Sequence, residues 1–394
     1  MRITHFVETF SPLSETFVYH HIVECEQQGT RNQVLTLRRD NERERPWSTV
    51  DLAELPPRGH PWRVWARLAT QAGLTPPAEQ YFGIWRRRIR EILLKQKPDV
   101  IHAHFGPAGV LILPVAQALH IPVVVTFYGY DISSLPRSGF WREKYRVLAR
   151  GAAAVVGVSN HICESLVAHG FSESKIRLIH LGVDPTQFLY SDPVSRFDGR
   201  RIACLHVGRL VPKKAPLHLV EAFAQARMEL YPELDLSLAI AGDGPLREGV
   251  YERVQSLRVA DCVEILGRVP HELVGRLLSQ AHLYTQHCMT GPDGDEEGQP
   301  VSFVEASASG LPIVATRHDG IPEVVLDGVS GYLVPEGDVQ AMATRIVELC
   351  QRPVLWTQFG AAGRRHVEDN FCLQRETQKQ IRLFEEVVRS NREI

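Results

Sequence analysis

The sequence predicts an α/β protein with two doubly wound domains, each a parallel sheet covered by helices on both faces. Its 394 residues exceed what one hydrophobic core usually organises, so two domains are expected. Short apolar runs alternate with stretches of helical periodicity along the whole chain, which is typical of repeated β-α-β units. The hydrophobic fraction of 44% and the charged fraction of 23% are ordinary for a soluble globular protein.

The first half of the chain contains six apolar runs that we predict to be buried strands. They are Ile3–Val7, Gln33–Leu37, Asp99–Phe105, Pro122–Phe127, Ala152–Ser159 and Lys175–Leu181. Ser14 is placed to cap a helix that starts at Glu15, and Ser159 is placed to cap the helix after the fifth run. Residues 185–200 are polar, contain two prolines and lack periodicity, so we expect a hinge there.

The second half repeats this pattern with four further strand candidates. They are Ile202–Val207, Leu236–Ala241, Val263–Leu266 and Leu311–Thr316, and residues 281–286 lead from the third of them toward the loop that begins at Gly291. A helix is expected from Val301 to about Ser309, since Gly310 supplies a helix stop and Pro312 prevents continuation. Further helices are expected from Val339 to about Leu349 and from about Leu373 onward.

These elements predict how the chain divides into domains. The first domain covers residues 1–190, residues 191–200 form a linker, and the second domain covers residues 201–372. The closing helix, residues 373–394, is expected to cross back onto the first domain. Residues 1–190 hold 22 Lys and Arg against 17 Asp and Glu, whereas the remainder holds 22 against 29. This asymmetry indicates that the first domain faces an anionic partner or surface.

The chain shows no sign of export or of membrane insertion. Arg2 leads directly into a strand, so no signal peptide is expected, and no apolar run is long enough to span a bilayer. The seven scattered cysteines are typical of buried thiols in a reducing compartment. The net charge of −2 gives no indication of a nucleic-acid partner. We therefore expect a cytoplasmic protein, with peripheral contact to the inner face of the membrane left open.

Residues 38–98 are rich in Pro, Arg and Trp and fit two interpretations. The side chains of Trp62, Trp65 and Trp85, with the run Arg86–Arg88, suit a membrane surface, where aromatics insert and guanidinium groups meet lipid phosphates. The alternative is a pair of amphipathic helices packed on the first domain with a solvated basic face.

Two basic residues mark the turn after the first strand of the second half. Arg209 follows the strand and Lys214 precedes a helix. Two cations at a strand-to-helix turn can clamp an anion such as a diphosphate, and the alternative is a solvated basic loop. We expect this turn to be exposed, so that substitutions there leave folding little changed.

Residues 291–331 join an acidic, glycine-rich loop to the start of a helix. The loop ends at Pro300, and the unpaired N–H groups and the dipole at the start of the following helix favour an anion. Glu297 precedes that helix end, and Glu305 lies two turns into the helix. Carboxylates can accept hydrogen bonds from sugar hydroxyls, although Glu305 could instead face solvent on an ordinary helix.

The string from Glu297 through Gly298-Gln299-Pro300 to Glu305, followed by GLPIVAT and GIPEVV, resembles the retaining glycosyltransferases of family 4. The resemblance extends over nearly the whole chain. It implies a GT-B architecture, two Rossmann-like domains facing across a cleft, with the donor mainly on the second and the acceptor on the first. It also implies a nucleoside-diphosphate sugar as donor, UDP- or GDP-linked, with no bound cofactor and no metal, and a saccharide or lipid-linked saccharide as acceptor.

The resemblance assigns roles to the residues of the second domain. Arg209 and Lys214 would hold the diphosphate, Glu297 the donor sugar and Glu305 the ribose. The remaining donor-side residues, which contribute mainly backbone groups, are Gly298, Val301, Ser302 and Arg268.

Residues at strand ends of the first domain are expected on the acceptor side: Ser14, Glu15, His104, Tyr128 and Asp131. The stretch from Ser14 to Phe17 is similar to the S-E-T-F variant of colanic-acid-type exopolysaccharide transferases, and its alternative is an ordinary capped helix start. Tyr128 stands where many relatives have a histidine; it can donate a hydrogen bond but cannot act as an imidazole. Asp131 would either accept from an acceptor hydroxyl or cap a helix. His102 is expected to pack, and no third ligand lies at metal spacing near it and His104 in the sequence.

Three other functions are compatible with the same architecture. One is a sugar-nucleotide epimerase, which would convert the nucleotide sugar without an acceptor. Another is a phosphorylase, which would need a pyridoxal-bearing lysine. The third is an inactive module that binds a nucleotide sugar; the presence of Arg209, Lys214, Glu297 and Glu305 argues against it, and Tyr128 argues mildly for it.

Overall fold

A computed structural model describes residues 1–12, 15–76 and 79–393, and these divide into two compact units. Unit 1 comprises residues 1–158, 163–179 and 377–394, and unit 2 comprises residues 159–162 and 180–376. Residues 180–200, which include the predicted linker, pack within unit 2. The domain limits drawn from the sequence remain predictions.

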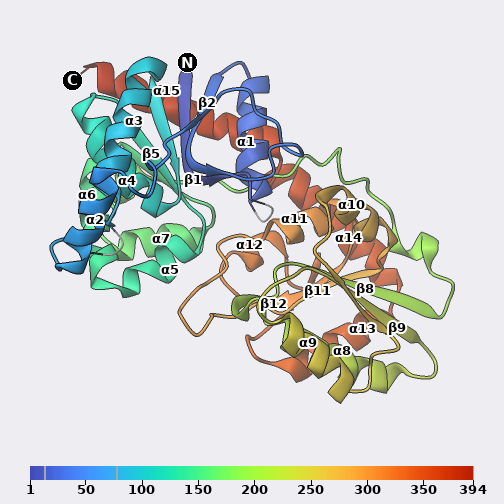
Figure 1. The fold of residues 1–394 in the computed structure, drawn as a ribbon. Helices are drawn as coiled ribbons and strands as arrows, with labels where there is room; N and C mark the ends of the chain where they lie inside the picture. Colours follow the sequence, from blue (N-terminus) through green and yellow to red (C-terminus); the bar gives the residue numbers. More distant parts are fainter. Residues whose placement is uncertain (13–14, 77–78, 394) are drawn as a thin grey trace. The chain divides into compact units, whose positions relative to one another are not determined.

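Unit 1 is built on a seven-stranded parallel sheet in the order β3-β2-β1-β4-β5-β6-β7 (Figure 1). Its central strands β4 and β5 are buried at every position, as expected for parallel strands covered on both faces. Strand order reverses between β1 and β4, the place where doubly wound sheets bind ligands. The strands are β1 (Arg2–Phe10), β2 (Arg31–Arg39), β3 (Val50–Leu52), β4 (Val100–His104), β5 (Val123–Phe127), β6 (Ala154–Gly157) and β7 (Ile176–Leu178).

Helices follow most of these strands, as right-handed crossovers between parallel strands require. They are α1 (Thr16–Gln27), α2 (Pro61–Gln71), α3 (Phe82–Gln96), α4 (Gly106–Ala118), α5 (Tyr130–Ser133), α6 (Gly139–Gly151) and α7 (Asn160–Ala168). The hydroxyl of Ser159 accepts from the N–H of Ile162 at 3.3 Å, which confirms the predicted cap of α7. Helix α1 begins at Thr16 with Glu15 at its N-cap, one residue later than predicted. Ser14 lies outside the described residues.

Unit 2 is built on a six-stranded parallel sheet in the order β10-β9-β8-β11-β12-β13. The strands are β8 (Arg201–Val207), β9 (Asp235–Ala241), β10 (Val263–Gly267), β11 (Leu283–Gln286), β12 (Ile313–Thr316) and β13 (Gly331–Val334). The helices are α8 (Pro216–Leu230), α9 (Arg247–Ser256), α10 (His271–Gln280), α11 (Val301–Ala308), α12 (Ile321–Val324), α13 (Val339–Gln351) and α14 (Val354–Asn370). Gly310 adopts φ +84° just after α11, which confirms the predicted helix stop.

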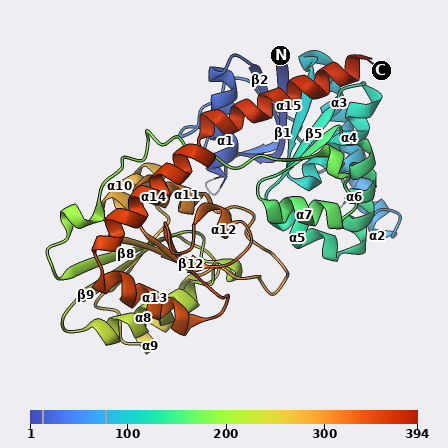
Figure 2. The ribbon, with the colours of Figure 1, turned by 180° about the vertical axis from the view of Figure 1, so that it is seen from behind.

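The closing helix α15 (Leu373–Glu393) returns to unit 1 from Thr377 onward. Leu383 and Phe384 pack with Ile3, Val100 and Val124, so the end of the chain completes the core beside β1, β4 and β5. Figure 2 shows this part of α15 crossing the sheet near the strands labelled β1 and β5.

The stretch 38–98 forms β3, α2 and α3, and its two helices differ in how they pack. Helix α3 buries Phe82, Ile89 and Leu93, whereas α2 buries none of its residues. Among the helices of the described ranges, none is both long and apolar enough to cross a membrane. The pair of helices predicted from the sequence is therefore present, and α2 is left with an open apolar side.

Candidate functional site

The turn from β8 into α8 places the two predicted cations differently. Arg209 is exposed, whereas Lys214, at the end of the 3-10 turn Pro212–Lys214, is only 7% exposed. The expectation that the whole turn is exposed is therefore wrong for Lys214. The turn packs tightly on the loop after β9, because a Cβ on Gly242 would lie 1.8 Å from the carbonyl oxygen of Gly208. Only glycine permits this approach, which fixes the backbone that carries Arg209.

Lys214 forms an ion pair with the first motif glutamate. Its Nζ lies 2.8 Å from Oε2 of Glu297, and Lys213 Nζ lies 3.8 Å from the same oxygen. Burial alone would raise the pKa of Glu297, but Lys214 and Lys213, with Arg209, outweigh it and lower the pKa to about 2. Glu297 is therefore an ionised acceptor at neutral pH, held beside a buried cation.

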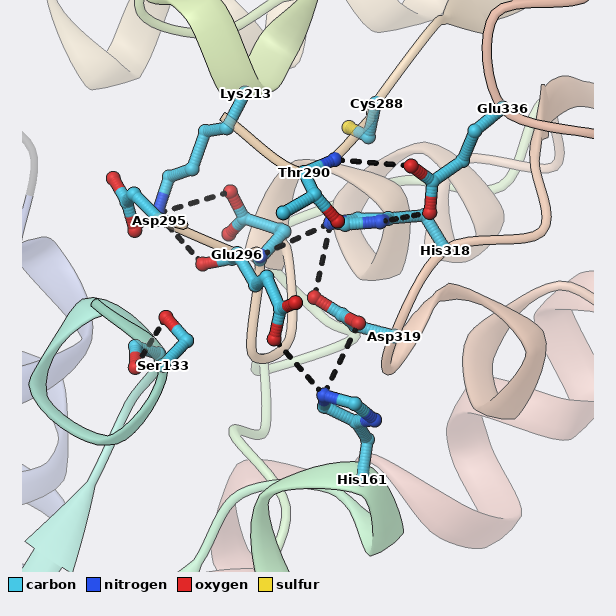
Figure 3. Close-up of polar contacts among 12 residues, drawn as sticks. Ser133, His161, Lys213, Cys288, Thr290, Asp295, Glu296, His318, Asp319 and Glu336 are labelled. Carbon is cyan, nitrogen blue, oxygen red and sulfur yellow. Dashed lines mark hydrogen bonds and ion pairs between the residues drawn. The ribbon is translucent and has the colours of Figure 1, made fainter. Parts of the chain in front are cut away.

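Lys213 holds the acidic loop before α11 in place. This residue was not among the predicted site residues. Lys213 Nζ donates to Oδ1 of Asp295 and to the carbonyl oxygen of Glu296, both at 2.9 Å, as Figure 3 shows. Its own carbonyl accepts from the N–H of Met289 at 2.9 Å. Burial would lower the pKa of Lys213, but Glu297 and Asp295 outweigh it and raise the pKa. The lysine thus fixes the loop that presents Glu297.

His318 holds the same loop from the other side. Its Nδ1 lies 2.6 Å from Oε1 of Glu336, and its Nε2 lies 2.9 Å from Oδ2 of Asp319 and 3.2 Å from the backbone nitrogen of Glu297 (Figure 3 shows the two carboxylate contacts). Burial opposes protonation of His318, but Asp319 and Glu336 outweigh it and raise its pKa. In the neutral form Nε2 accepts the Glu297 N–H, so the histidine orients the peptide of a motif residue.

The start of α11 is available for an anion. The N-cap is Pro300, whose ring carries no acceptor for the N–H groups of Val301 and Ser302. The hydroxyl of Tyr284 donates a hydrogen bond of 2.9 Å to Oγ of Ser302. The tyrosine itself is fully buried. The tyrosine therefore ties the start of α11 to β11, and the binding of an anion at this helix end remains a prediction.

Glu305 points into unit 2 rather than into solvent. It is 6% exposed, and its Oε1 lies 2.9 Å from Nε2 of His271 at the start of α10. The alternative of a solvent-facing residue on an ordinary helix is therefore excluded. The histidine orients one carboxylate oxygen, and the role of Glu305 toward a ribose remains a prediction.

The Gly298-Gln299-Pro300 motif has a structural explanation in Gln299. This side chain is 3% exposed and exchanges two hydrogen bonds with the backbone of Leu181, at 2.9 Å and 2.7 Å. The glutamine thus anchors the loop to the segment that follows β7. Gly298 is buried next to it, and Arg268 is exposed after β10.

The predicted acceptor-side residues that the structure describes lie in unit 1, where His104 and Asp131 are buried and Glu15 and Tyr128 are partly buried. His104 is 1% exposed, and its Nδ1 lies 2.7 Å from the hydroxyl of Tyr128. The carboxylate of Asp131 is fully buried and accepts from the N–H groups of Gly106, Tyr128 and Gly129. Burial raises the pKa of Asp131 to about 6, although these N–H groups favour its ionised form. Asp131 therefore ties two loops together, and its role toward an acceptor hydroxyl remains a prediction.

Both halves of the chain match known families of glycosyltransferases. Residues 14–187 match the family described as "Glycosyltransferase Family 4", and residues 191–366 match the one described as "Glycosyl transferases group 1". A putative colanic acid biosynthesis glycosyltransferase, WcaL of Salmonella typhimurium, is 29% identical over 88% of this chain and 90% of its own length. A GDP-mannose-dependent phosphatidylinositol monomannoside mannosyltransferase of Mycolicibacterium smegmatis is 33% identical over 69% of this chain and 73% of its own.

A solved structure supports the fold over the whole chain. The crystal structure of HepE of Anabaena in complex with UDP superposes with a TM-score of 0.77 at 17% identity, covering 98% of this chain and 100% of the other. Two parallel-sheet Rossmann-like units are the GT-B fold class that the sequence predicted. The chain belongs to the family 4 glycosyltransferases.

Proposed function

We propose that this enzyme transfers a hexosyl group from a nucleoside-diphosphate sugar to a hydroxyl of a saccharide or lipid-linked saccharide, with retention of anomeric configuration. The observation that carries the proposal is the grouping in unit 2 of Lys214, Glu297 and the N-terminus of α11. A cation, an ionised acceptor and a helix end together suit a diphosphate joined to a sugar.

The reaction follows from what these groups can do. Arg209 and Lys214 neutralise the charge that develops on the departing diphosphate as the bond from the anomeric carbon to phosphate oxygen breaks. Glu297 holds sugar hydroxyls. The new bond to the acceptor oxygen forms on the same face, and the departing phosphate takes the acceptor's proton. The protein then contributes orientation and charge stabilisation, with no covalent intermediate on a side chain.

The names of related proteins support a nucleotide sugar but leave its base open. The mycobacterial relative is GDP-mannose-dependent by name, and the HepE crystal contains UDP. The relationship to WcaL supports a role in exopolysaccharide or other cell-surface glycan synthesis. A thermal-shift screen with uridine, guanosine and adenosine diphosphate sugars identifies the base, because a ligand that binds only the native state raises its melting temperature.

We expect transfer to survive removal of divalent cations. Lys214, Arg209 and the helix end supply the positive charge that a metal would otherwise supply at the diphosphate. The measurement is release of the nucleoside diphosphate, with acceptor present, in excess EDTA and in added Mg²⁺ or Mn²⁺. Equal rates are expected. Complete loss in EDTA that Mg²⁺ or Mn²⁺ restores would contradict this charge assignment.

The same assay separates the main alternatives. An epimerase would convert the nucleotide sugar into its epimer without an acceptor, whereas a transferase needs one. Product analysis with and without acceptor distinguishes the two. An inactive binding module would show stabilisation by the nucleotide sugar but no turnover in either reaction.

Peripheral membrane contact through α2 is a further expectation for a lipid-linked acceptor. Trp62, Trp65 and Leu68 on this helix are exposed, and the guanidinium of Arg87 lies 4.2 Å from the centre of the Trp62 ring. We expect the chain to float with vesicles that contain anionic lipid and to lose most of this binding in the variant Trp65→Ser. Met228→Ser, which removes an exposed apolar side chain from unit 2, is the control. A wild-type chain that stays unbound would exclude this surface.

A further inference from the structure

Four histidines from three elements of unit 1 meet between the sheet and α1. His5 lies on β1 directly opposite His102 on β4, and His104 follows two residues later on the same face of that strand. His21 comes from α1. His5, His102 and His104 are buried, and His21 is partly buried. No third ligand could be predicted near His102 and His104, because His5 and His21 lie far from them in the sequence.

Three of these rings form a nearly equilateral triangle. The centres of His5 and His102 are 5.3 Å apart, those of His21 and His102 are 5.5 Å apart, and those of His5 and His21 are 5.8 Å apart. One ring nitrogen from each lies within 4.8 Å of the other two. Metal–nitrogen bonds of about 2.0–2.1 Å place tetrahedral ligands about 3.4 Å apart, so a modest convergence of the rings would bring them to bonding distance.

A hydrogen bond to Asn32 fixes which nitrogen of His5 carries the lone pair. Nδ2 of Asn32 donates to Glu26, so its Oδ1 accepts, and it lies 3.1 Å from Nε2 of His5. The lone pair of His5 is then on Nδ1, where it accepts from Nε2 of His104 at 3.2 Å. A metal ion bound to Nδ1 of His5 would take the place of the hydrogen atom that His104 donates there.

At His102 one ring nitrogen is hydrogen-bonded and the other is not. Its Nε2 lies 2.8 Å from Oγ1 of Thr126, a hydroxyl that can donate or accept, while its Nδ1 is buried and has no hydrogen-bond partner among the described residues. A buried nitrogen without a hydrogen-bond partner is unfavourable, and an ion bound to it would remove that cost. Thr126 and Asn32 stand where outer partners usually orient metal-binding histidines.

The third ring makes two long hydrogen bonds. Nδ1 of His21 lies 3.4 Å from Oγ1 of Thr377 and its Nε2 lies 3.5 Å from Sγ of Cys25, so a metal ion at His21 would displace one weak contact. Burial, with help from His21, lowers the pKa of His5 to about 3, and burial lowers the pKa of His21 to about 4. The imidazoles are therefore neutral at physiological pH, which is the form that binds metals.

We propose that His5, His21 and His102 form a binding site for a divalent transition-metal ion, with Zn²⁺ as the preferred ion. Three imidazoles with one open position suit Zn²⁺, and a fourth place can be taken by water or by His104. The ion would join β1, α1 and β4 and so stabilise unit 1. The site lies in unit 1, and none of its three proposed ligands is among the residues assigned to the transfer reaction.

The test uses the full chain without a histidine tag. Zn²⁺ is added, excess is removed by dialysis, and bound metal is measured by inductively coupled plasma mass spectrometry, together with the melting temperature. We expect about one Zn²⁺ per chain and a melting temperature that rises with Zn²⁺. The variant His21→Gln should bind Zn²⁺ at least 100-fold more weakly, since even loss of an outer partner costs about 10- to 100-fold. His169→Gln, the same change outside the cluster, should bind like the wild type.

The proposal is overturned if the wild-type chain retains no Zn²⁺, or if His21→Gln binds it as tightly as the wild type does. Should His21→Gln not fold, Co²⁺ added to the wild-type chain decides the question. Intense visible absorption from a four-coordinate ion supports the site, and the weak bands of six-coordinate Co²⁺ contradict it. Transfer activity in EDTA is a separate measurement, so failure of this proposal and failure of the proposed function are distinguishable.

Discussion

Arg209→Ala should lower the rate of glycosyl transfer by roughly 30- to 1000-fold, which corresponds to about 2–4 kcal/mol of transition-state stabilisation. Arg209 is exposed, so its removal leaves no buried charge behind and the melting temperature should change little. The measurement is kcat/KM for transfer, with Arg253→Ala as control because Arg253 is a partly exposed arginine on α9 paired with Glu221. Near-normal turnover in Arg209→Ala would remove this residue from the diphosphate site.

Lys214→Ala should show a comparable loss of transfer and, in addition, a loss of stability. Lys214 is buried against Glu297, so its removal takes away the ion pair at 2.8 Å and leaves that carboxylate with Lys213 Nζ at 3.8 Å. Leaving a buried charged group without its partner costs about 1–3 kcal/mol or more. Urea unfolding distinguishes this variant from Arg209→Ala, whose folding should be nearly normal. Equal stability of the two variants would show that the buried ion pair contributes little.

The sequence was sufficient to predict the elements that local patterns control. The helix expected from Val301 to about Ser309 is α11, Val301–Ala308, and the strand expected at Leu236–Ala241 is β9, Asp235–Ala241. Continuous apolar runs identify parallel strands because both faces are covered, and Gly310 marks a helix end because it adopts a positive φ.

Local sequence patterns could not predict which residues contact the site residues. His271 contacts Glu305 from 34 positions away, and Gln299 contacts Leu181 from 118 positions away. Lys213 and Lys214 are neighbours in sequence, yet only packing shows that one holds the acidic loop and the other faces Glu297. The Gly298-Gln299-Pro300 motif could have identified Gln299 as a site residue. The sequence around His271 and around His318 contains no motif that predicts their contacts.

The two glutamates should differ in what they bind. Glu305→Gln keeps the shape of the side chain, but an amide accepts hydrogen bonds less strongly than a carboxylate. It should therefore weaken binding of the free nucleoside diphosphate by about tenfold, together with binding of the complete donor. His271 can still contact the amide, so the fold of α11 should be retained.

Glu297→Gln should leave binding of the free nucleoside diphosphate nearly intact while lowering transfer by roughly 10- to 100-fold. The change removes the negative charge that Lys214 faces at 2.8 Å, so the lysine remains available to the diphosphate. The hydroxyls of the donor sugar lose a charged acceptor, and discrimination between epimeric sugars should fall with the rate.

Calorimetric titration of UDP and of GDP against both variants separates the two roles, with transfer rates measured alongside. Glu233→Gln, an exposed glutamate after α8, controls for the loss of one negative charge from unit 2. Melting temperatures identify any variant that fails to fold. If Glu297→Gln weakens the free nucleotide as much as Glu305→Gln does, the assignment of Glu297 to the sugar and Glu305 to the ribose is wrong. Membership in the family would stand in that case, because it rests on the match of both halves of the chain.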